Sequence, residues 1–404
     1  MSNYSRFTAV LFHRQATGAK LCALILLTAV LSACGGAGQN DATLVQTDCP
    51  AAQQLESAVD CVMSRFLEST GVTAATVTVV RHGAPILDKG YGYKDAARTI
   101  PLQANALLVT ASIVKPVTSA AIQKLAATGV LRLSDHAFCT GSNAPCWLPA
   151  ELLSPGSDPR ACTITISHLL RMTAGFDSGG SGDPILQEAA IQQQFNLATP
   201  PQRRDVIRYR MAKPLDSAPG QTYKYSNFGY LVLGQIIEQA SETSYVDFAN
   251  STIFAPMGVA RADFAGAASR LRDHDLREPN YICTKTGPSV YERGATVQLN
   301  DGTISTNNWV SGGFAVTTSR AMAMLGANYR IWDSNSNLEG MPLNGSTADQ
   351  WWHGEWCGTQ SIVAQRASGV SYAVLMNKNS PDYSDQYARV LQGMLNTLLQ
   401  QLDM

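Results

Sequence analysis

The globular part of the chain begins with a helical pattern that is followed at once by two strand patterns. Residues 51–69 carry apolar side chains at helical spacing. Residues 73–93, TAATVTVVRHGAPILDKGYGY, predict two strands joined by a turn at His82-Gly83, because β-branched residues stand on both sides of that dipeptide. A helix followed by a hairpin is typical of one layer of an α+β fold.

The C-terminal part carries a second strand pair, followed by a helix. SIVAQRA (361–367) and SYAVLMN (371–377) predict two strands around a Ser368-Gly369 turn, and a helix is predicted over roughly 384–401. Between the two ends, from 112 to about 270, helical spacing prevails. We therefore expect the first and last segments to join one sheet, with a helical domain inserted between them.

The first 33 residues are typical of an export signal. Three basic residues precede LCALILLTAVLSA (21–33), an apolar stretch that is short for a membrane span and ends in small residues. Leu31-Ser32-Ala33-Cys34 resembles the lipobox of bacterial lipoproteins, in which the cysteine is lipidated. This predicts a signal peptide over 1–33, a tether over 34–50 and a lipid anchor at Cys34 on the periplasmic face of a bacterial membrane. The alternative is an ordinary cleaved signal in which Cys34 is incidental.

The composition argues against a protein that binds nucleic acid. The chain has 30 basic and 31 acidic residues, and the leader contains three of the basic residues and none of the acidic ones. The mature protein is therefore slightly acidic, and no basic patch stands out. Hydrophobic residues make up 45% of the 404 residues, which is enough for a large core.

Seven of the nine cysteines lie beyond the leader, and export to an oxidising compartment favours disulfides. Cys139 and Cys146 bracket a turn-rich loop, and Cys49 lies near Cys61, so these pairs are expected first. An odd number leaves at least one thiol unless it pairs between chains. No two cysteines have the spacing C-x-x-C and no His-x-x-x-His is present, so we predict no metal site.

Ser112 and Lys115, in LLVTASIVKPVTSAAIQKL (107–125), form the first candidate site. Residues three apart on a helix share one face. A serine hydroxyl needs an adjacent base, and a partly desolvated lysine can have a pKa low enough to act as one. Pro116 is tolerated near a helix start, which agrees with a start near Ser112. The same spacing is also typical of an amphipathic helix with a solvated lysine.

Tyr225 and Asn227 form the second candidate site, at a turn that leads into an apolar helix. A tyrosine between positive groups can sit near its ionised form and exchange protons with a serine. Asn227 could hydrogen-bond a substrate amide or hold the lysine. The alternative is that Asn227 caps the helix while Tyr225 packs its ring.

Taken in order, these segments resemble the serine β-lactamase and penicillin-binding protein superfamily, and within it the class C-like β-lactamase-related serine hydrolases. That group includes D,D-carboxypeptidases, D-aminopeptidases and family VIII esterases. The resemblance covers about residues 50–400 and rests on SIVKP (112–116), LRLSD (131–135), HLLRMTAGF (168–176), PG-x-x-Y-x-YSNFGY-x-x-LG-x-IIE (219–238) and VLMN (374–377). It implies an α+β, β-lactamase/transpeptidase-like fold: a mixed, mainly antiparallel sheet flanked by helices, with an inserted helical domain.

The resemblance also implies domain limits and residue roles. One hydrolase domain would span 51–404, with a sheet subdomain at about 51–111 and 309–404 and a helical subdomain at about 112–308. Ser112 resembles the acylated nucleophile, Lys115 and Tyr225 the proton-handling pair, and Asn227 a ligand of the substrate or the lysine. The oxyanion hole would use the N–H of Ser112 and one from the strand of the third motif.

The third motif of the family is K-T-G or H-x-G on a strand beside the site, and the chain offers two candidates for it. Lys285-Thr286-Gly287 is followed by Pro288, which cannot donate to a strand ladder, and by no closing strands. His353-Gly354, in QWWHGEWCGTQSIVAQRA (350–367), leads directly into the closing strands and is the better candidate. Cys357 in this segment could pair with Cys283 and hold the K-T-G loop near the site.

Two registers fit the segment around His353. Either His353 takes the first position of the motif, or Trp352-His353-Gly354 forms a W-x-G like that of some family VIII esterases. We favour His353, because imidazole can bind a carboxylate or donate a hydrogen bond where indole only donates. The second oxyanion donor is the N–H of Glu355 or Trp356, depending on the register. A buried aromatic cluster with an incidental histidine is a further alternative.

These residues predict an exported serine hydrolase that works through a serine acyl-enzyme on D-alanyl peptides, β-lactams or small esters and amides. No metal or organic cofactor is implied. The alternative is a catalytically inactive lipoprotein of the same fold that binds cell-wall peptides or a protein partner, and the irregular third motif motivates it. An α/β-hydrolase is disfavoured because GGSGD (179–183) fails the G-x-S-x-G pattern at its last position.

Overall fold

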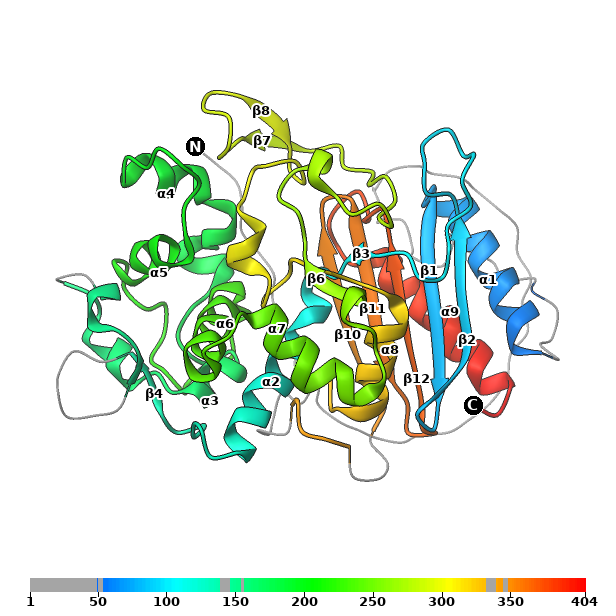
Figure 1. Ribbon diagram of the computed structural model, residues 1–404, viewed down its shortest axis with the longest axis horizontal. Coiled ribbons are helices and arrows are strands. Elements are labelled where there is room, and N and C mark those ends of the chain that lie inside the picture. Colours follow the sequence, from blue (N-terminus) through cyan, green and yellow to red (C-terminus); the bar gives the residue numbers. More distant parts are fainter. Residues whose placement is uncertain (1–48, 50–53, 139–145, 154–155, 332–338, 344–347) are drawn as a thin grey trace, which may run out of the picture. The chain divides into compact units, whose positions relative to one another are not determined.

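Figure 1 shows the computed structural model, which describes residue 49 and residues 54–138, 146–153, 156–331, 339–343 and 348–404. These residues belong to one compact unit, Leu44–Met404. Within them, no helix is both long enough and apolar enough to cross a bilayer. The predicted signal peptide, Cys34 and nearly all of the predicted tether lie outside the described residues.

Five strands form the main sheet in the order β10–β11–β12–β1–β2, and every pairing in this sheet is antiparallel. The strands are β1 (Ala74–Arg81), β2 (Ala84–Gly92), β10 (Gln350–Trp356), β11 (Thr359–Gln365) and β12 (Val370–Met376). The pairing of β1 with β12 joins the start of the folded chain to its end, as the sequence predicted. This topology leaves β10 at one edge of the sheet, beside the helical part of the chain (Figure 1).

The hairpin between β1 and β2 turns at the predicted dipeptide. His82 and Gly83 have φ angles of 48° and 80°, both in the left-handed region. A two-residue turn with positive φ at both positions matches the right-handed twist of the flanking strands. Glycine adopts this conformation without strain, which explains its place at the second position.

Helices cover both faces of the sheet (Figure 1). α1 (Leu55–Thr70) and α9 (Gln386–Gln401) pack together on one face, and α8 (Ser319–Asn328) packs on the other. The side chains of β12 alternate between the two cores, because successive residues of a strand point to opposite faces. Tyr372 and Val374 lie in the core with α1 and α9, whereas Ala373 and Leu375 lie in the core with α8.

Helices are the prevailing regular structure between β2 and α8. α2 (Lys115–Ala127) packs against α6 (Asn227–Ser241), and the same region contains α3 (Ile166–Leu170), α4 (Glu188–Gln194), α5 (Arg203–Met211) and α7 (Tyr245–Ala249). The N-cap of α6 is Ser226, whose Oγ accepts a hydrogen bond from the Gly229 N–H at 3.0 Å. Asn227 is therefore the first residue of the helix and not its cap, and its side chain is available for other contacts.

Short strands complete the structure. β3 (Leu108–Val109), β9 (Ala315–Thr317) and β6 (Phe264–Gly266) form a small antiparallel sheet in the order β3–β9–β6. β4 (His136–Phe138) pairs in parallel with β5 (Cys146–Leu148), and β7 (Thr286–Pro288) pairs with β8 (Thr296–Gln298) in a hairpin. The segment 271–308, in which the β7–β8 hairpin lies, is otherwise mostly irregular.

The disulfides follow pairings that the sequence analysis suggested. Two of them join described residues: Cys49–Cys61 and Cys283–Cys357. Cys146 is also disulfide-bonded, and its predicted partner Cys139 lies outside the described residues. Cys162 remains a thiol, in keeping with the odd number of cysteines.

Candidate active site

Ser112 lies where a strand is followed by a helix. After β3, the 3-10 turn Ala111–Val114 continues directly into α2 at Lys115. Ala111 has a φ of 44°, a left-handed conformation that is uncommon for a residue with a Cβ and that often occurs beside reactive residues. Pro116 occupies the first turn of α2, where its missing N–H breaks no helical hydrogen bond. This local structure places Ser112 at the N-terminal end of α2.

Lys115 brings the residues of the first two sequence motifs together. Its Nζ donates hydrogen bonds to Ser112 Oγ at 3.0 Å, to Asn227 Oδ1 at 2.8 Å and to the carbonyl oxygen of Gly312. Ser112 Oγ lies 2.6 Å from the Tyr225 hydroxyl, which donates to Asn227 Oδ1 at 3.2 Å. The S-x-x-K and Y-x-N segments therefore form a single hydrogen-bonded group around Ser112.

The environment of Lys115 favours its neutral form. Its side chain is wholly buried, and the acceptors around its amine in the described structure are a hydroxyl, an amide and a carbonyl oxygen, none of them charged. Burial lowers the pKa of Lys115 to about 7, although the negative charges of Asp183 and Glu339 act in the opposite direction. Near pH 7 a large fraction of Lys115 is therefore an amine that can accept a proton from Ser112.

Tyr225 does not sit near its ionised form, which corrects the sequence-based expectation. Burial raises the pKa of Tyr225 above its usual value, the hydrogen bond with Ser112 lowers it by less, and the charge of Asp183 raises it further. The expectation assumed positive groups on both sides of the phenol. In the described structure the cation beside the ring is Lys115, whose own pKa is lowered.

Asp183 orients the amide of Asn227, and the sequence analysis did not select it. Asn227 Nδ2 donates to Asp183 Oδ2 at 2.7 Å, and Ser178 Oγ donates to the same atom at 2.9 Å. An ionised carboxylate only accepts, so the amide must turn its NH₂ group toward Asp183 and its oxygen toward Lys115. Asp183 is the last residue of GGSGD (179–183), the segment that fails the G-x-S-x-G pattern of α/β-hydrolases.

Gly312 and Glu339 were also missed. Gly312 contributes only a backbone carbonyl, and the Gly312-Gly313 pair was the one available sign of a close backbone approach. Glu339 is buried and accepts hydrogen bonds from Ser119 Oγ at 2.8 Å and Tyr230 OH at 3.1 Å.

Among the described residues, no group of His, Cys, Asp and Glu side chains could hold a metal ion.

β10 borders Ser112, as a strand of the third motif should. A Cβ placed on Gly354 would lie 2.6 Å from the Thr110 carbonyl oxygen and 2.7 Å from the Ser112 nitrogen. Only glycine therefore allows the strand to approach Ser112 this closely. Because side chains alternate along a strand, Trp352 and Trp356 share the face of Gly354 that meets Ser112.

The side chain of His353 lies on the opposite face of β10, so the prediction that it contacts substrate is wrong. Its Nδ1 lies 3.3 Å from Asp385 Oδ2, and its Nε2 lies 2.8 Å from Gln392 Oε1 on α9. The ring stacks on Trp351 at 4.7 Å, and burial lowers the pKa of His353. The strand thus has the W-x-G register, Trp352-His353-Gly354. His353 was preferred because of the chemistry of its imidazole. That chemistry does not indicate which face of β10 the side chain occupies.

The K-T-G tripeptide takes no part in this strand, in agreement with the sequence analysis. Thr286–Pro288 form β7, which pairs with β8 outside the main sheet. Lys285 Nζ lies 3.6 Å from the ring centroid of Tyr383. The disulfide Cys283–Cys357, which the sequence had suggested, attaches this hairpin to the chain immediately after β10.

Comparison with known proteins identifies the family. The sequence matches the family model described as Beta-lactamase over residues 59–394, so the chain belongs to the β-lactamase family. Its antiparallel sheets flanked by helices form the β-lactamase/transpeptidase-like fold. A D-amino acid amidase from Ochrobactrum anthropi SV3, solved in complex with L-phenylalanine, superposes with a TM-score of 0.60 and 18% identity, covering 86% of this chain and 99% of that one.

Sequence relatives match shorter stretches. Protein flp from Staphylococcus aureus (strain N315) is 29% identical over 206 residues, which is 51% of this chain and 38% of that protein. Esterase EstB from Burkholderia gladioli is 27% identical over 226 residues, which is 54% of this chain and 53% of the esterase. The matches therefore span about two fifths of the staphylococcal protein and about half of the esterase.

The contact of Gly354 with Ser112 leads to a prediction. We expect Gly354→Ala to slow the labelling of Ser112 by an acylating probe by about 100-fold, because the new Cβ must push β10 away from two backbone atoms. The labelling rate can be followed by intact-mass spectrometry. Gly393→Ala on α9 is the matched control, since a Cβ there meets no atom within 4 Å apart from its chain neighbours and the backbone of its own helix. Equal rates for Gly354→Ala and the wild type would contradict the proximity of β10.

Proposed function

We propose that the protein is an exported serine hydrolase that acts by acyl transfer, with Ser112 as the acylated nucleophile and small uncharged esters or amides as substrates. The observation that carries the proposal is the hydrogen-bonded group around Ser112 Oγ, with the Tyr225 hydroxyl at 2.6 Å and Lys115 Nζ at 3.0 Å. A hydroxyl within hydrogen-bond reach of an oriented base is typical of nucleophilic catalysis.

In the acylation step, the neutral amine of Lys115 takes the proton of Ser112 while Oγ attacks the substrate carbonyl carbon. The lowered pKa of Lys115 supports its role as the base, and the raised pKa of Tyr225 argues against a resting phenolate. Asn227 holds the lysine during this transfer, because its amide oxygen accepts from both Lys115 and Tyr225.

The bond between the carbonyl carbon and the leaving group then breaks, and the leaving group takes up a proton. The Tyr225 hydroxyl lies next to Ser112 Oγ, so it can donate its proton to the leaving group. Tyr225 then regains a proton from Lys115, which took one from Ser112. A water molecule afterwards gives its proton to the same pair and attacks the serine ester. This second step releases the acid and restores Ser112.

The developing negative charge on the substrate oxygen needs two N–H donors. The N–H of Ser112 is the first, and the W-x-G register makes the N–H of Glu355 the second. The carboxylate of Glu355 does not oppose this charge at close range. It accepts from Ser380 Oγ at 3.1 Å and from the Asp385 N–H at 3.0 Å, on the face of β10 that carries His353.

The third motif favours uncharged substrates. D-alanyl peptides and β-lactams carry a carboxylate, and in the K-T-G and H-x-G forms of the motif the first residue can supply a positive charge to it. Here that position holds Trp352, and the lysine of the K-T-G tripeptide lies against Tyr383. Indole donates one hydrogen bond and has no charge. The names of two relatives, an esterase and a D-amino acid amidase, point to ester or amide substrates.

We include the lipid anchor at Cys34 and the periplasmic face of a membrane in the proposal. The lipobox-like Leu31-Ser32-Ala33-Cys34 and the disulfides Cys49–Cys61 and Cys283–Cys357 support it. We expect Cys34→Ala to move the protein from the membrane fraction to the soluble fraction of a bacterial host, as immunoblotting would show. A wild-type protein that is already soluble would instead indicate an ordinary cleaved signal.

The role of Ser112 has a direct test. We expect the wild type to hydrolyse p-nitrophenyl butyrate, and we expect Ser112→Ala to lower kcat by at least about 10⁴-fold because no acyl-enzyme can form. Ser64→Ala, at an exposed position of α1, is the control.

Fluorescent penicillin should label the wild type weakly or not at all. Measurable binding of cell-wall peptides with no covalent adduct from any ester or lactam would favour the inactive alternative.

The pH dependence of acylation follows from Lys115. The base must be deprotonated, so we expect the acylation rate to rise with pH through about 7 and then to level off. Asp183→Asn removes a charge that raises the pKa of Lys115, so the rise should move to lower pH. Stopped-flow measurement of p-nitrophenol release gives both profiles. A rise at higher pH in the variant would contradict the assignment of Lys115 as the base.

A further inference from the structure

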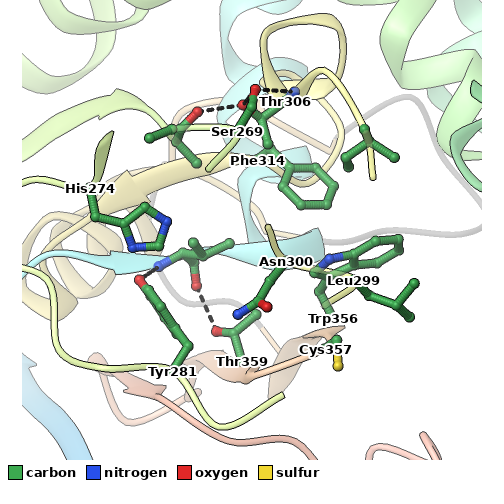
Figure 2. A pocket seen from close by; sticks show the side chains of 14 residues that line it. Ser269, His274, Tyr281, Leu299, Asn300, Thr306, Phe314, Trp356, Cys357 and Thr359 are labelled. Atoms are coloured by element: carbon green, nitrogen blue, oxygen red, sulfur yellow. Dashed lines mark hydrogen bonds between the residues drawn. The ribbon is translucent and has the colours of Figure 1, made fainter. Parts of the chain in front are cut away.

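A pocket lies at the end of β10, beside the residues that surround Ser112, and the chemistry proposed above does not use it (Figure 2). Its mainly apolar lining includes Val109, Ile304, Phe314 and Trp356. Its volume is about 20 Å³, which is room for one group of the size of a water molecule. The pocket can therefore receive the end of a small substituent without rearrangement.

The segments that build the active site continue into the walls of this pocket. Trp356 is two residues beyond Gly354 on the same face of β10, and Val109 is three residues before Ser112. Phe314 is two residues beyond Gly312, the carbonyl acceptor for Lys115, and its ring meets Trp356 edge-to-face at 5.1 Å. The pocket therefore lies along the direction in which β10 runs on from Gly354.

Three polar atoms in the pocket lack hydrogen-bond partners. They are Asn300 Oδ1, Asn300 Nδ2 and Trp356 Nε1, which are buried and have no partner among the described residues. Buried polar atoms are normally hydrogen-bonded, so this set indicates a ligand or an ordered water molecule. The set offers N–H donors from Asn300 and Trp356 and a carbonyl acceptor from Asn300, and a hydroxyl group can both accept and donate a hydrogen bond.

The walls of the pocket are held in place, which favours selection by shape. Cys357 lines the pocket and forms the disulfide with Cys283. The Tyr281 hydroxyl, on another wall, accepts from the Val109 N–H at 2.9 Å (Figure 2). It also donates to Glu278 at 2.8 Å. A preformed pocket binds a matching group with little loss of conformational entropy.

We propose that this pocket is an acyl subsite that recognises short 3-hydroxyacyl groups, with the hydroxyl bound by Asn300 and Trp356. The inference rests on the proposed function. Gly354 meets Ser112, and Trp356 follows two strand residues, about 7 Å, further along the same face of β10. A short acyl chain directed along this face would therefore carry its hydroxyl toward Trp356.

The test compares p-nitrophenyl butyrate with p-nitrophenyl 3-hydroxybutyrate, which share a leaving group and chain length. We expect the wild type to have a kcat/KM about tenfold higher for the hydroxy ester, since its hydroxyl can pair with buried polar atoms that the butyryl chain leaves unpaired. Asn300→Leu removes the amide at nearly constant size, and the ratio of the two values should fall to about one. Asn328→Leu, at a half-buried asparagine of α8 bonded to the Met324 carbonyl, is the matched control and should keep the wild-type ratio.

Each outcome has a distinct meaning. A wild-type ratio of about one, or an unchanged ratio in Asn300→Leu, would overturn the subsite and leave the pocket as a place for a buried water molecule only. If Asn300→Leu does not fold, Trp356→Phe, which removes the indole donor, should lower the ratio about threefold. If neither ester acylates Ser112, as judged by intact mass, the proposed function itself fails.

Discussion

The amine of Lys115 is wholly buried, and its acceptors in the described structure are uncharged oxygens of Ser112, Asn227 and Gly312. Three acceptors match the three protons of an ammonium group, so the charged form is hydrogen-bonded but not neutralised. Asp183 acts on the lysine through Asn227 and not by contact. A carboxylate in direct contact would favour the ammonium form. Desolvation prevails instead, and it makes the lysine a base near pH 7.

This arrangement depends on segments that are distant in sequence. α2 carries Ser112 at its start, α6 begins with Asn227, and the segment before β9 supplies Gly312. β10 closes the site from the C-terminal part of the chain, and the pairing of β12 with β1 holds that part against the N-terminal strands. The interrupted sheet therefore places a strand edge beside the first turn of a helix. No short stretch of the chain could assemble this geometry by itself.

Sequence reasoning succeeded where spacing along one element carries the information. Ser112 and Lys115 meet because they are three residues apart in a helical turn, and the Tyr225-x-Asn227 segment was marked by its own helix start. It failed at His353, because both faces of β10 are partly buried and aromatic, so no polar alternation shows which face meets the nucleophile. Asp183 and Glu339 were missed because Asn227, Ser119 and Tyr230, which they bond near the site, lie far away along the chain and no local pattern marks the two acids.

The K-T-G hairpin shows how a familiar tripeptide can take another role. Its lysine lies over Tyr383, and the first position of the motif on β10 is Trp352, which offers no positive charge to a substrate carboxylate. The hairpin is nevertheless tied to the end of β10 through Cys283–Cys357, and Cys357 lines the pocket next to Trp356. The segment therefore contributes a fixed wall and not a charge. Because the first position of the third motif is an uncharged tryptophan, we expect selection among substrates to come from such walls and from unpaired polar atoms such as those of Asn300 and Trp356.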